Sequence, residues 1–130
     1  MVFKQTRRVV FCETDASGRV HFTQILKWVE EAEHGFLEKI GVSVFSPSQG
    51  WPRVKVECSY RQPFQFGDEA KIELELLVVG ASSLTWGFQV RAVDGATAAE
   101  GAVVTVLVSE DGKQEIPAKM RALLERAKKA

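Results

Sequence analysis

Residues 13–22, ETDASGRVHF, contain the side chain of this chain that is best placed for chemistry. Asp15 is followed by Gly18, and both residue types favour turns for backbone reasons, so the pair alone predicts only a turn. The turn, however, leads directly into a long segment with helical spacing. The first turn of a helix presents unpaired N–H groups and partial positive charge. Asp15 is therefore either a turn residue or a carboxylate held beside a site that polarises a carbonyl group.

A carboxylate beside a helix N-terminus suffices for one reaction in particular. The N–H groups stabilise a developing oxyanion, and the ionised carboxylate attacks the carbonyl carbon or activates a water molecule. A thiolate leaves with little help because a free thiol has a pKa of about 8.5, whereas an amine must be protonated before it leaves. If Asp15 does more than hold the turn, the arrangement predicts cleavage of a thioester rather than an amide.

Other catalytic arrangements are missing from the sequence. The two histidines, His21 and His34, are not spaced as a helical zinc pair, and no Cys-x-x-Cys accompanies them. No glycine-rich phosphate loop follows a strand, and no G-x-S-x-G motif occurs. We therefore expect no metal site, no nucleotide-binding fold and no serine triad. Three roles stay open for His21: it orients Asp15 or a water molecule, lines the pocket, or packs in place of an aromatic residue.

The segment after Asp15 has the period of a long amphipathic helix. Its apolar residues recur in steps of three and four, as on one broad helix face. They are Phe22, Ile25, Leu26, Val29, Ala32, Phe36, Leu37 and Ile40. Lys39 and Gly41 suit the end of a helix. At about 1.5 Å per residue the helix is about 28 Å long, so a sheet of similar length is needed to cover its apolar face.

Alternating patterns predict the strands of that sheet. The expected strands are 6–11, 54–60, 69–79, 83–93 and 102–108, the last a nearly continuous apolar run typical of burial on both faces. Two Asp-Gly pairs, at 94–95 and 111–112, predict tight turns, and 43–52 is expected to be a loop. Pro117 opens an amphipathic helix that extends to residue 130.

One strand, a long helix, four strands in meander-like succession and a short terminal helix indicate an α+β protein. We expect an antiparallel five-stranded sheet wrapped around one long central helix, which is the hot dog fold. Residues 1–130 are expected to form one domain, with a core over 1–116 and a C-terminal helix over 117–130. Trp86 shares a strand face with Leu84 and Phe88, which favours a place in the core.

The composition is that of an ordinary globular domain. The chain has 130 residues, with 17 Lys plus Arg against 17 Asp plus Glu, so charge gives no case for a nucleic-acid or membrane partner. A net charge of zero also suits a chain that buries surface in an oligomer. The two cysteines, Cys12 and Cys58, are expected to be buried and reduced. No run of membrane-spanning length and no signal-peptide core occurs, so we expect a cytoplasmic protein.

The segment ETDASGRVHFTQILKWVEEA resembles the opening motif of the 4-hydroxybenzoyl-CoA thioesterase family, acidic-x-D-x-x-G-x-V followed by aromatic residues and a helix with W/F and E-A. The matching positions are Asp15, Gly18, Val20, Phe22, Trp28, Glu30 and Ala32. CSYRQPFQFGDEAKIEL is similar to the family's Y-x-x-P-x-x-x-G-D turn, with Tyr60, Pro63, Gly67 and Asp68 in place. The resemblance runs from about Arg7 to Pro117. VHFTQ is also similar to the Y-F-N-Q of cyanobacterial 1,4-dihydroxy-2-naphthoyl-CoA thioesterases, which hints at an aromatic acyl group.

The resemblance implies an acyl-CoA thioesterase with Asp15 as nucleophile or general base and the backbone N–H of Phe22 as oxyanion donor. It implies that Gly18 lets the loop pass close to the thioester, and it leaves His21 among the catalytic candidates. The substrate contacts that it implies are Val20, Thr23, Tyr60, Arg61 and Pro63. Coenzyme A is part of the substrate, and no cofactor is implied. The active site would lie at a subunit interface of a homodimer or homotetramer.

The chain departs from the family pattern in several places. His21 stands where the family often has Tyr or Trp, Glu33 stands where it often has Arg, and the turn VVGASS lacks the basic cluster that holds nucleotide phosphates in some members. Either the CoA phosphates are held elsewhere or the acyl group arrives on an acyl carrier protein. The remaining candidates for phosphate contacts, which are equally typical of solvated strand faces, are Arg53, Lys55, Arg61 and Arg91.

Further residues have two open interpretations. Trp51, Trp86 and Phe64 line an acyl pocket or pack in the core or an interface. Glu30, Glu31 and Glu33 are expected on a solvated or interface face, with Glu31 and Glu33 as alternatives to Asp15 because other hot dog lineages use a helix glutamate. A hydratase would need a paired Asp and His, or His and Glu, across the pocket, and the expected D-x-x-x-x-H spacing is missing here. A non-catalytic ligand-binding module, in which Asp15 serves only the turn, is the rival from another class.

Overall fold

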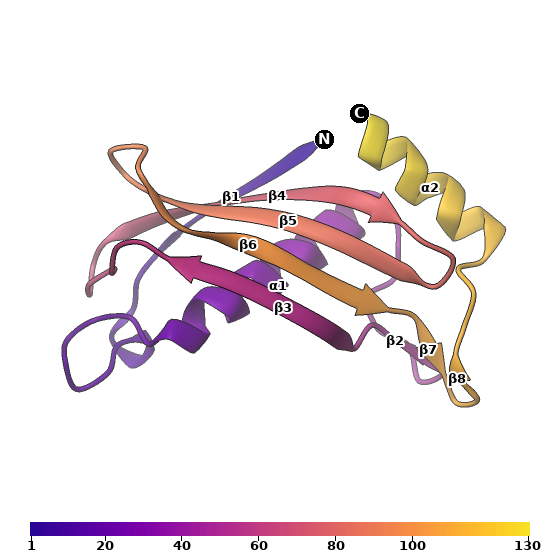
Figure 1. Cartoon of the computed structure of the whole chain (residues 1–130), viewed down its shortest axis with the longest axis horizontal. Helices are drawn as coiled ribbons and strands as arrows, with labels where there is room; N and C mark the ends of the chain where they lie inside the picture. The colour runs from indigo at the N-terminus through magenta and orange to yellow at the C-terminus, as the bar shows by residue number, and fades with distance from the viewer.

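The computed structural model describes residues 1–130 and has a long helix, α1, lying across one face of a five-stranded antiparallel sheet (Figure 1). The order of strands across the sheet is β1-β4-β5-β6-β3. The elements are β1 (Val2–Arg8), a 3-10 turn (Phe11–Glu13), α1 (Phe22–Lys39), β2 (Gln49–Gly50), β3 (Arg53–Tyr60), β4 (Glu69–Val79), β5 (Ser83–Ala92), β6 (Thr97–Val106), β7 (Val108–Ser109), β8 (Gly112–Lys113) and α2 (Ala118–Lys129). The five-stranded sheet with one long and one short helix confirms the predicted hot dog fold.

The helix α1 has the bounds that its period predicts, and its apolar face covers the sheet. Phe36 packs edge-on against Trp86 of β5, with ring centroids 5.0 Å apart, and both side chains are buried. Gly35 allows the close approach of β1, because a Cβ there would stand 2.9 Å from the Phe3 ring. Gly41 ends the helix with φ +83°, a conformation that glycine adopts without strain. Neither α1 nor α2 combines the length and the apolar character needed to cross a membrane.

The strand order differs from the predicted succession. β4, β5 and β6 form a meander, but β3 lies beside β6 rather than β4, with Tyr60 opposite Ala99. The other edge of β4 pairs with β1 along its whole length, from Val2 opposite Glu75 to Arg8 opposite Glu69. Because β1 occupies that edge, β3 is left at the far side of the sheet. The short strands β2, β7 and β8 form a small second sheet that includes part of the expected loop 43–52.

The first strand begins and ends earlier than expected, since β1 covers 2–8 rather than 6–11. The chain leaves the sheet after Arg8 because the Glu13 carboxylate accepts a hydrogen bond from the Val10 N–H at 3.0 Å and closes a 3-10 turn. Cys12 lies in this turn and is exposed, so the prediction of burial is wrong for it; Cys58 on β3 is half-buried. Both cysteines are free.

The sheet has one buried face and one open face. On β4 the residues that alternate toward α1 are buried, as predicted: Ala70, Ile72, Leu74 and Leu76. The prediction that 102–108 is buried on both faces is wrong, because Val103 and Thr105 are buried while Val104 is half-buried. No second layer of this chain covers the outer face of β6. At the edge, Val54 and Val56 of β3 are 61% and 42% exposed, and a register shift between Arg53 and Lys55 interrupts the alternation at Val54.

Candidate functional site

The loop before α1 is a small hairpin closed by backbone hydrogen bonds. Thr14 bridges to Val20, and the Asp15 N–H donates to the Arg19 carbonyl at 2.8 Å. The Gly18 N–H donates back to the Asp15 carbonyl at 3.0 Å, and Gly18 has φ +81°. That left-handed conformation favours glycine, so the structure gives Gly18 a turn role.

The Asp15 carboxylate is exposed and takes part in this turn through one oxygen. Its Oδ1 accepts hydrogen bonds from the Ser17 N–H, at 2.8 Å, and from the Ser17 hydroxyl. Oδ2 makes no hydrogen bond within the chain. The hydrogen bonds from the Ser17 hydroxyl and N–H lower the pKa of Asp15 below its ordinary value. Asp15 is therefore ionised at neutral pH, with one oxygen anchored and the other available.

The base of the loop is fastened by a buried carboxylate that the sequence reasoning missed. Glu13 accepts hydrogen bonds from Trp28 Nε1 at 2.8 Å and from the Arg7 guanidinium, which also stacks over the Trp28 ring at 4.9 Å. Its backbone carbonyl accepts the His21 N–H at 3.0 Å. Burial raises the pKa of Glu13, but the hydrogen bonds and the Arg7 charge outweigh it and hold the pKa below its ordinary value. The signal in the sequence that could have identified Glu13 was its position, two residues before Asp15 and directly after an apolar strand.

The start of α1 is capped by His21. Its Nδ1 accepts a hydrogen bond from the Thr23 N–H at 3.3 Å and lies 2.6 Å from the Thr23 hydroxyl. His21 is exposed, and its carbonyl accepts the Gln24 N–H at 2.9 Å. The N–H of Phe22, the first residue of the helix, makes no hydrogen bond within the chain. It is one of the unpaired donors that a helix start provides.

A groove of about 440 Å³ lies between this loop, the start of α1 and the segment after β3. Its lining includes six of the predicted site residues: Asp15, Val20, Phe22, Tyr60, Arg61 and Pro63. Ile25, Phe64, Ala98 and Ala99 add apolar surface, and Ser17, Arg19 and Gln62 add polar groups. Gly18, His21 and Thr23 stand outside the lining, in the turn and the helix cap. The structure thus brings the carboxylate of Asp15 and residue Phe22 into one open groove.

Tyr60 connects the edge strand β3 to the start of α1. Its hydroxyl donates to the Phe22 carbonyl at 3.0 Å, and the two rings meet edge to face with centroids 6.2 Å apart. Burial, together with the neighbouring Cys58, raises the pKa of Tyr60 to about 12. The phenol therefore stays protonated as a donor and holds in place the residue that carries the unpaired N–H.

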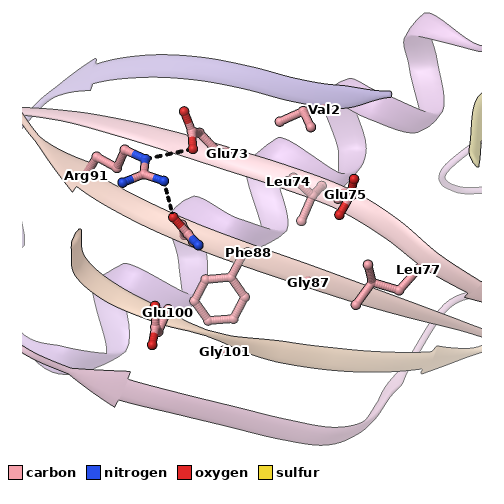
Figure 2. A pocket seen from close by; sticks show the side chains of 11 residues that line it. Val2, Glu73, Leu74, Glu75, Leu77, Gly87, Phe88, Arg91, Glu100 and Gly101 are labelled. Carbon is pink, nitrogen blue, oxygen red and sulfur yellow. Dashed lines mark hydrogen bonds and ion pairs between the residues drawn. The ribbon is translucent and has the colours of Figure 1, made fainter. Parts of the chain in front are cut away.

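The predicted phosphate contacts are widely separated. Arg53 binds Glu33, Lys55 pairs with Glu57 on the exposed edge strand, and only Arg61 lines the groove, where it also pairs with Glu100. Arg91 lies on the outer face of the sheet (Figure 2), where it binds Glu73 and Gln89 at the side of a separate hollow of about 470 Å³.

The helix glutamates are not equally solvated. Glu33 is only 3% exposed, so the prediction of a solvated face is wrong for it. Arg53 binds its Oε2 at 2.8 Å, while Oε1 is buried without a hydrogen-bond partner. Burial raises the pKa of Glu33 to about 7, against the opposing effect of Arg53. Glu30 contacts Arg53 from the surface and Glu31 pairs with Arg7, and none of the three lines the groove.

The aromatic candidates also separate. Phe64 lines the groove and packs edge-on against Trp28, with centroids 5.7 Å apart. Trp86 is a buried core residue, donating through Nε1 to Thr105 at 3.3 Å, as its strand face predicts. Trp51 is half-buried against the core and does not line the groove.

Residues 17–99 match the family model that is described as the thioesterase superfamily. Two curated 1,4-dihydroxy-2-naphthoyl-CoA hydrolases are similar. That of Prochlorococcus marinus (strain NATL2A) is 35% identical over 96 residues, covering 65% of this chain and 62% of the relative. That of Synechococcus sp. (strain CC9605) is 37% identical over 94 residues, covering 65% and 63%. The chain thus matches less than two thirds of the length of these relatives.

Solved structures share the whole architecture. A 1,4-dihydroxy-2-naphthoyl-CoA thioesterase from Synechocystis superposes with a TM-score of 0.86 over 95% of this chain and 96% of that chain, at 20% identity. A gentisyl-coenzyme A thioesterase superposes with a TM-score of 0.86 over 93% of this chain and 98% of that chain, at 26% identity. The first likeness is evidence for the fold alone.

Proposed function

The chain belongs to the thioesterase superfamily, and on that premise we propose that it hydrolyses acyl thioesters of coenzyme A at the groove beside Asp15. One observation carries the proposal: the available oxygen of an ionised carboxylate and an unpaired helix N–H belong to residues that line the same groove. The thioesterases and hydrolases among the similar proteins support the choice of thioester chemistry.

In the proposed reaction, the thioester carbonyl oxygen accepts a hydrogen bond from the Phe22 N–H. Asp15 either attacks the carbonyl carbon or removes a proton from a water molecule that attacks it. The negative charge that develops on the oxygen is stabilised by the helix N–H and the partial charge of the helix start. The carbon–sulfur bond then breaks, the thiolate leaves, and water supplies the oxygen of the product acid.

The groove favours an aromatic acyl group. Phe22, Tyr60 and Phe64 contribute three rings to its lining, and Val20, Ile25 and Pro63 add aliphatic surface. Flat rings pack well against aromatic side chains. The curated relatives named for a naphthoyl-CoA substrate agree with this proposal.

The proposal includes a homodimer or homotetramer. The groove lies beside β3, whose outer edge is unpaired and whose Val54 and Val56 are exposed. An edge with exposed valines is suited to pairing with another chain. A second copy on that edge would stand next to the groove.

The first test measures thiol release from short, long and aromatic acyl-CoAs by the wild type and by Asp15→Asn. We expect turnover of at least one acyl-CoA, reduced about a thousandfold by the substitution, because the amide cannot act as nucleophile or base. The amide oxygen still accepts the Ser17 hydrogen bonds, so the turn should be retained. Asp94→Asn is a matched control, since Asp94 accepts the Ala96 N–H in the same kind of turn, away from the groove.

Two results would contradict the proposal. Full activity in Asp15→Asn would remove Asp15 from catalysis. Binding of acyl-CoA without turnover by the wild type would leave a ligand-binding module in which Asp15 serves only the turn.

A further inference from the structure

The side chains that line the groove divide into an exposed rim and a buried floor. Asp15 and Phe22 belong to the rim, where the Phe22 side chain is 58% exposed. The floor consists of four apolar residues that are at most 4% exposed: Ile25, Phe64, Ala98 and Ala99. An apolar acyl group that reacts beside Asp15 is therefore expected to extend inward, from the rim toward the floor.

Phe64 is the largest side chain of the floor, and a second ring lies behind it. Trp28 of α1 packs edge-on against Phe64, with ring centroids 5.7 Å apart at an angle of 68°. Trp28 is 1% exposed and does not line the groove. The space on the far side of Phe64 is thus filled by a buried indole.

The indole of Trp28 is held in place by two neighbours. Its Nε1 donates a hydrogen bond to the buried Glu13 carboxylate at 2.8 Å, and the Arg7 guanidinium lies over the ring, 4.9 Å from its centroid. Moving the indole aside would leave the Glu13 carboxylate with one hydrogen bond fewer in a buried site, which is costly. Phe64 therefore cannot retreat to make the groove deeper.

The backbone around Phe64 is fixed as well. The Phe64 carbonyl accepts the Val20 N–H at 2.9 Å, which ties it to the loop of Asp15. The Ala98 carbonyl accepts the N–H groups of Arg61 and Gln62, at 2.8 and 3.2 Å, which ties the preceding segment to β6. The same loop that carries Asp15 is thus joined directly to the floor, so rim and floor keep a fixed separation.

We propose that Phe64, backed by Trp28, is the stop that sets the depth of the acyl pocket and so determines which acyl groups are accepted. An aromatic ring or a short chain fits between rim and floor, whereas a long straight chain does not. The inference rests on the proposed hydrolysis of acyl-CoA and adds a specificity-determining residue to it. Methylene groups that cannot pass the stop stay in water and add nothing to transition-state binding.

The other floor residues offer less depth to gain. Ala98 and Ala99 carry a single methyl group each, and Ala99 is held between Val90 of β5 and Tyr60 of β3 in the sheet. Shortening these side chains would change the floor little. Phe64 is the floor residue whose truncation removes the most side-chain volume, so it is the position at which the depth of the pocket is open to test.

The test measures kcat/KM for acetyl-, hexanoyl-, dodecanoyl- and benzoyl-CoA with the wild type, Phe64→Ala and the milder Phe64→Leu. Phe66→Ala is the matched control, because Phe66 is a phenylalanine of the same loop that is 63% exposed and does not line the groove. The readout is the ratio of kcat/KM for dodecanoyl-CoA to that for benzoyl-CoA within each variant. A fraction of unfolded enzyme lowers both values equally and leaves this ratio unchanged.

In the wild type, kcat/KM should rise from acetyl- to hexanoyl-CoA and rise no further with dodecanoyl-CoA. In Phe64→Ala, the ratio of dodecanoyl- to benzoyl-CoA should increase at least about tenfold, with Phe64→Leu between this variant and the wild type. Phe66→Ala should keep the wild-type ratio within about twofold.

Three results would overturn the inference while leaving the proposed hydrolase intact. They are a wild type that prefers dodecanoyl- to hexanoyl-CoA, an unchanged ratio in Phe64→Ala, and an equal shift in Phe66→Ala. Absence of turnover of every acyl-CoA by the wild type would instead contradict the proposed hydrolysis itself. If neither variant of Phe64 folds, the dependence of the wild type on chain length decides.

Discussion

At the scale of single residues, the geometry of Asp15 is compatible with both of the roles that the sequence presented as alternatives. One carboxylate oxygen holds the turn through Ser17, while the other makes no bond within the chain. The same hydrogen bonds that shape the turn also favour the charged form, which proposed catalysis requires. A turn residue and a catalytic carboxylate are therefore compatible in one side chain.

Tyr60 is expected to act as a positioning residue for the Phe22 N–H. Removing its hydroxyl in Tyr60→Phe leaves the ring contact with Phe22 but releases the Phe22 carbonyl. We expect kcat to fall about tenfold with KM within about twofold. The loosened Phe22 N–H matters most in the transition state, where the negative charge on the carbonyl oxygen develops. Steady-state kinetics on the preferred acyl-CoA measure this. A rise in KM with kcat unchanged would instead make Tyr60 a substrate contact.

Glu13 is expected to stabilise the base of the loop in its ionised form. Its folded pKa lies below the ordinary value of 4.5, so its contribution is present above that pH and is lost as pH falls through the folded pKa. Glu13→Gln should lower the free energy of unfolding by about 2 kcal/mol at pH 7, with a smaller difference from the wild type at pH 4. Urea denaturation at both values measures this. Glu31→Gln, which changes the exposed partner of Arg7, is the control and should cost less than about 0.5 kcal/mol.

At the scale of elements, buried Glu33 and half-buried Arg53 join α1 to β3. The folded pKa of Glu33, about 7, lies above its ordinary 4.5, so the folded state binds more protons between these values. The free energy of unfolding contributed by Glu33 therefore decreases as pH rises from about 4.5 to 7. Glu33→Gln should flatten this decrease and be at least as stable as the wild type at pH 8.

Urea denaturation from pH 5 to 8 tests the Glu33 prediction. Glu30→Gln removes the exposed partner of the same arginine and should keep the wild-type pH dependence. An unchanged pH dependence in Glu33→Gln would show that another group titrates in this range.

The elements differ in how far the sequence predicts them. The period from Phe22 onward is sufficient for α1, because helical packing repeats locally. The burial of Glu33 was also available in the spacing, since it stands four residues after Val29 and four before Leu37 on the apolar side. The place of β3 in the sheet could not be predicted, because nothing in its alternating pattern distinguishes pairing with β6 from pairing with β4. Strand pairing depends on contacts far apart in the chain.

The site shows the same division. Asp15, Phe22, Tyr60 and Pro63 were predicted from motifs and line one groove in the structure. Arg19 and Glu13 were missed. Both are charged residues in a predicted loop, and the sequence does not show which of them is exposed and which is buried. Only the fold shows that one lines the groove and the other fastens it.

At the scale of the whole molecule, the unpaired edge of β3 predicts self-association. Its Val56 faces the same side of the sheet as buried Val103, yet it is 42% exposed in the single chain. Val56→Lys should raise the dissociation constant of the assembly about tenfold or more, because a charged side chain on an edge strand disfavours its pairing with another chain. Light scattering during size-exclusion chromatography measures the mass. Thr6→Lys, on the opposite edge strand β1, should leave the mass unchanged, and a monomeric wild type at micromolar concentration would contradict the prediction.

The fastening of the Asp15 loop at Glu13 also bears on how such proteins diversify. The two ends of the loop meet where the Glu13 carbonyl receives the His21 N–H, so residues 14–20 form a closed segment with its own hydrogen bonds. Inside that segment, Val20 packs against the hydrophobic core and Gly18 takes the left-handed conformation, so these two residues are tied to the fold. Evolution or an engineer can therefore exchange the other loop residues around Asp15 and obtain a new groove rim on an unchanged scaffold, provided that Gly18, Val20, Glu13, Arg7 and Trp28 are kept.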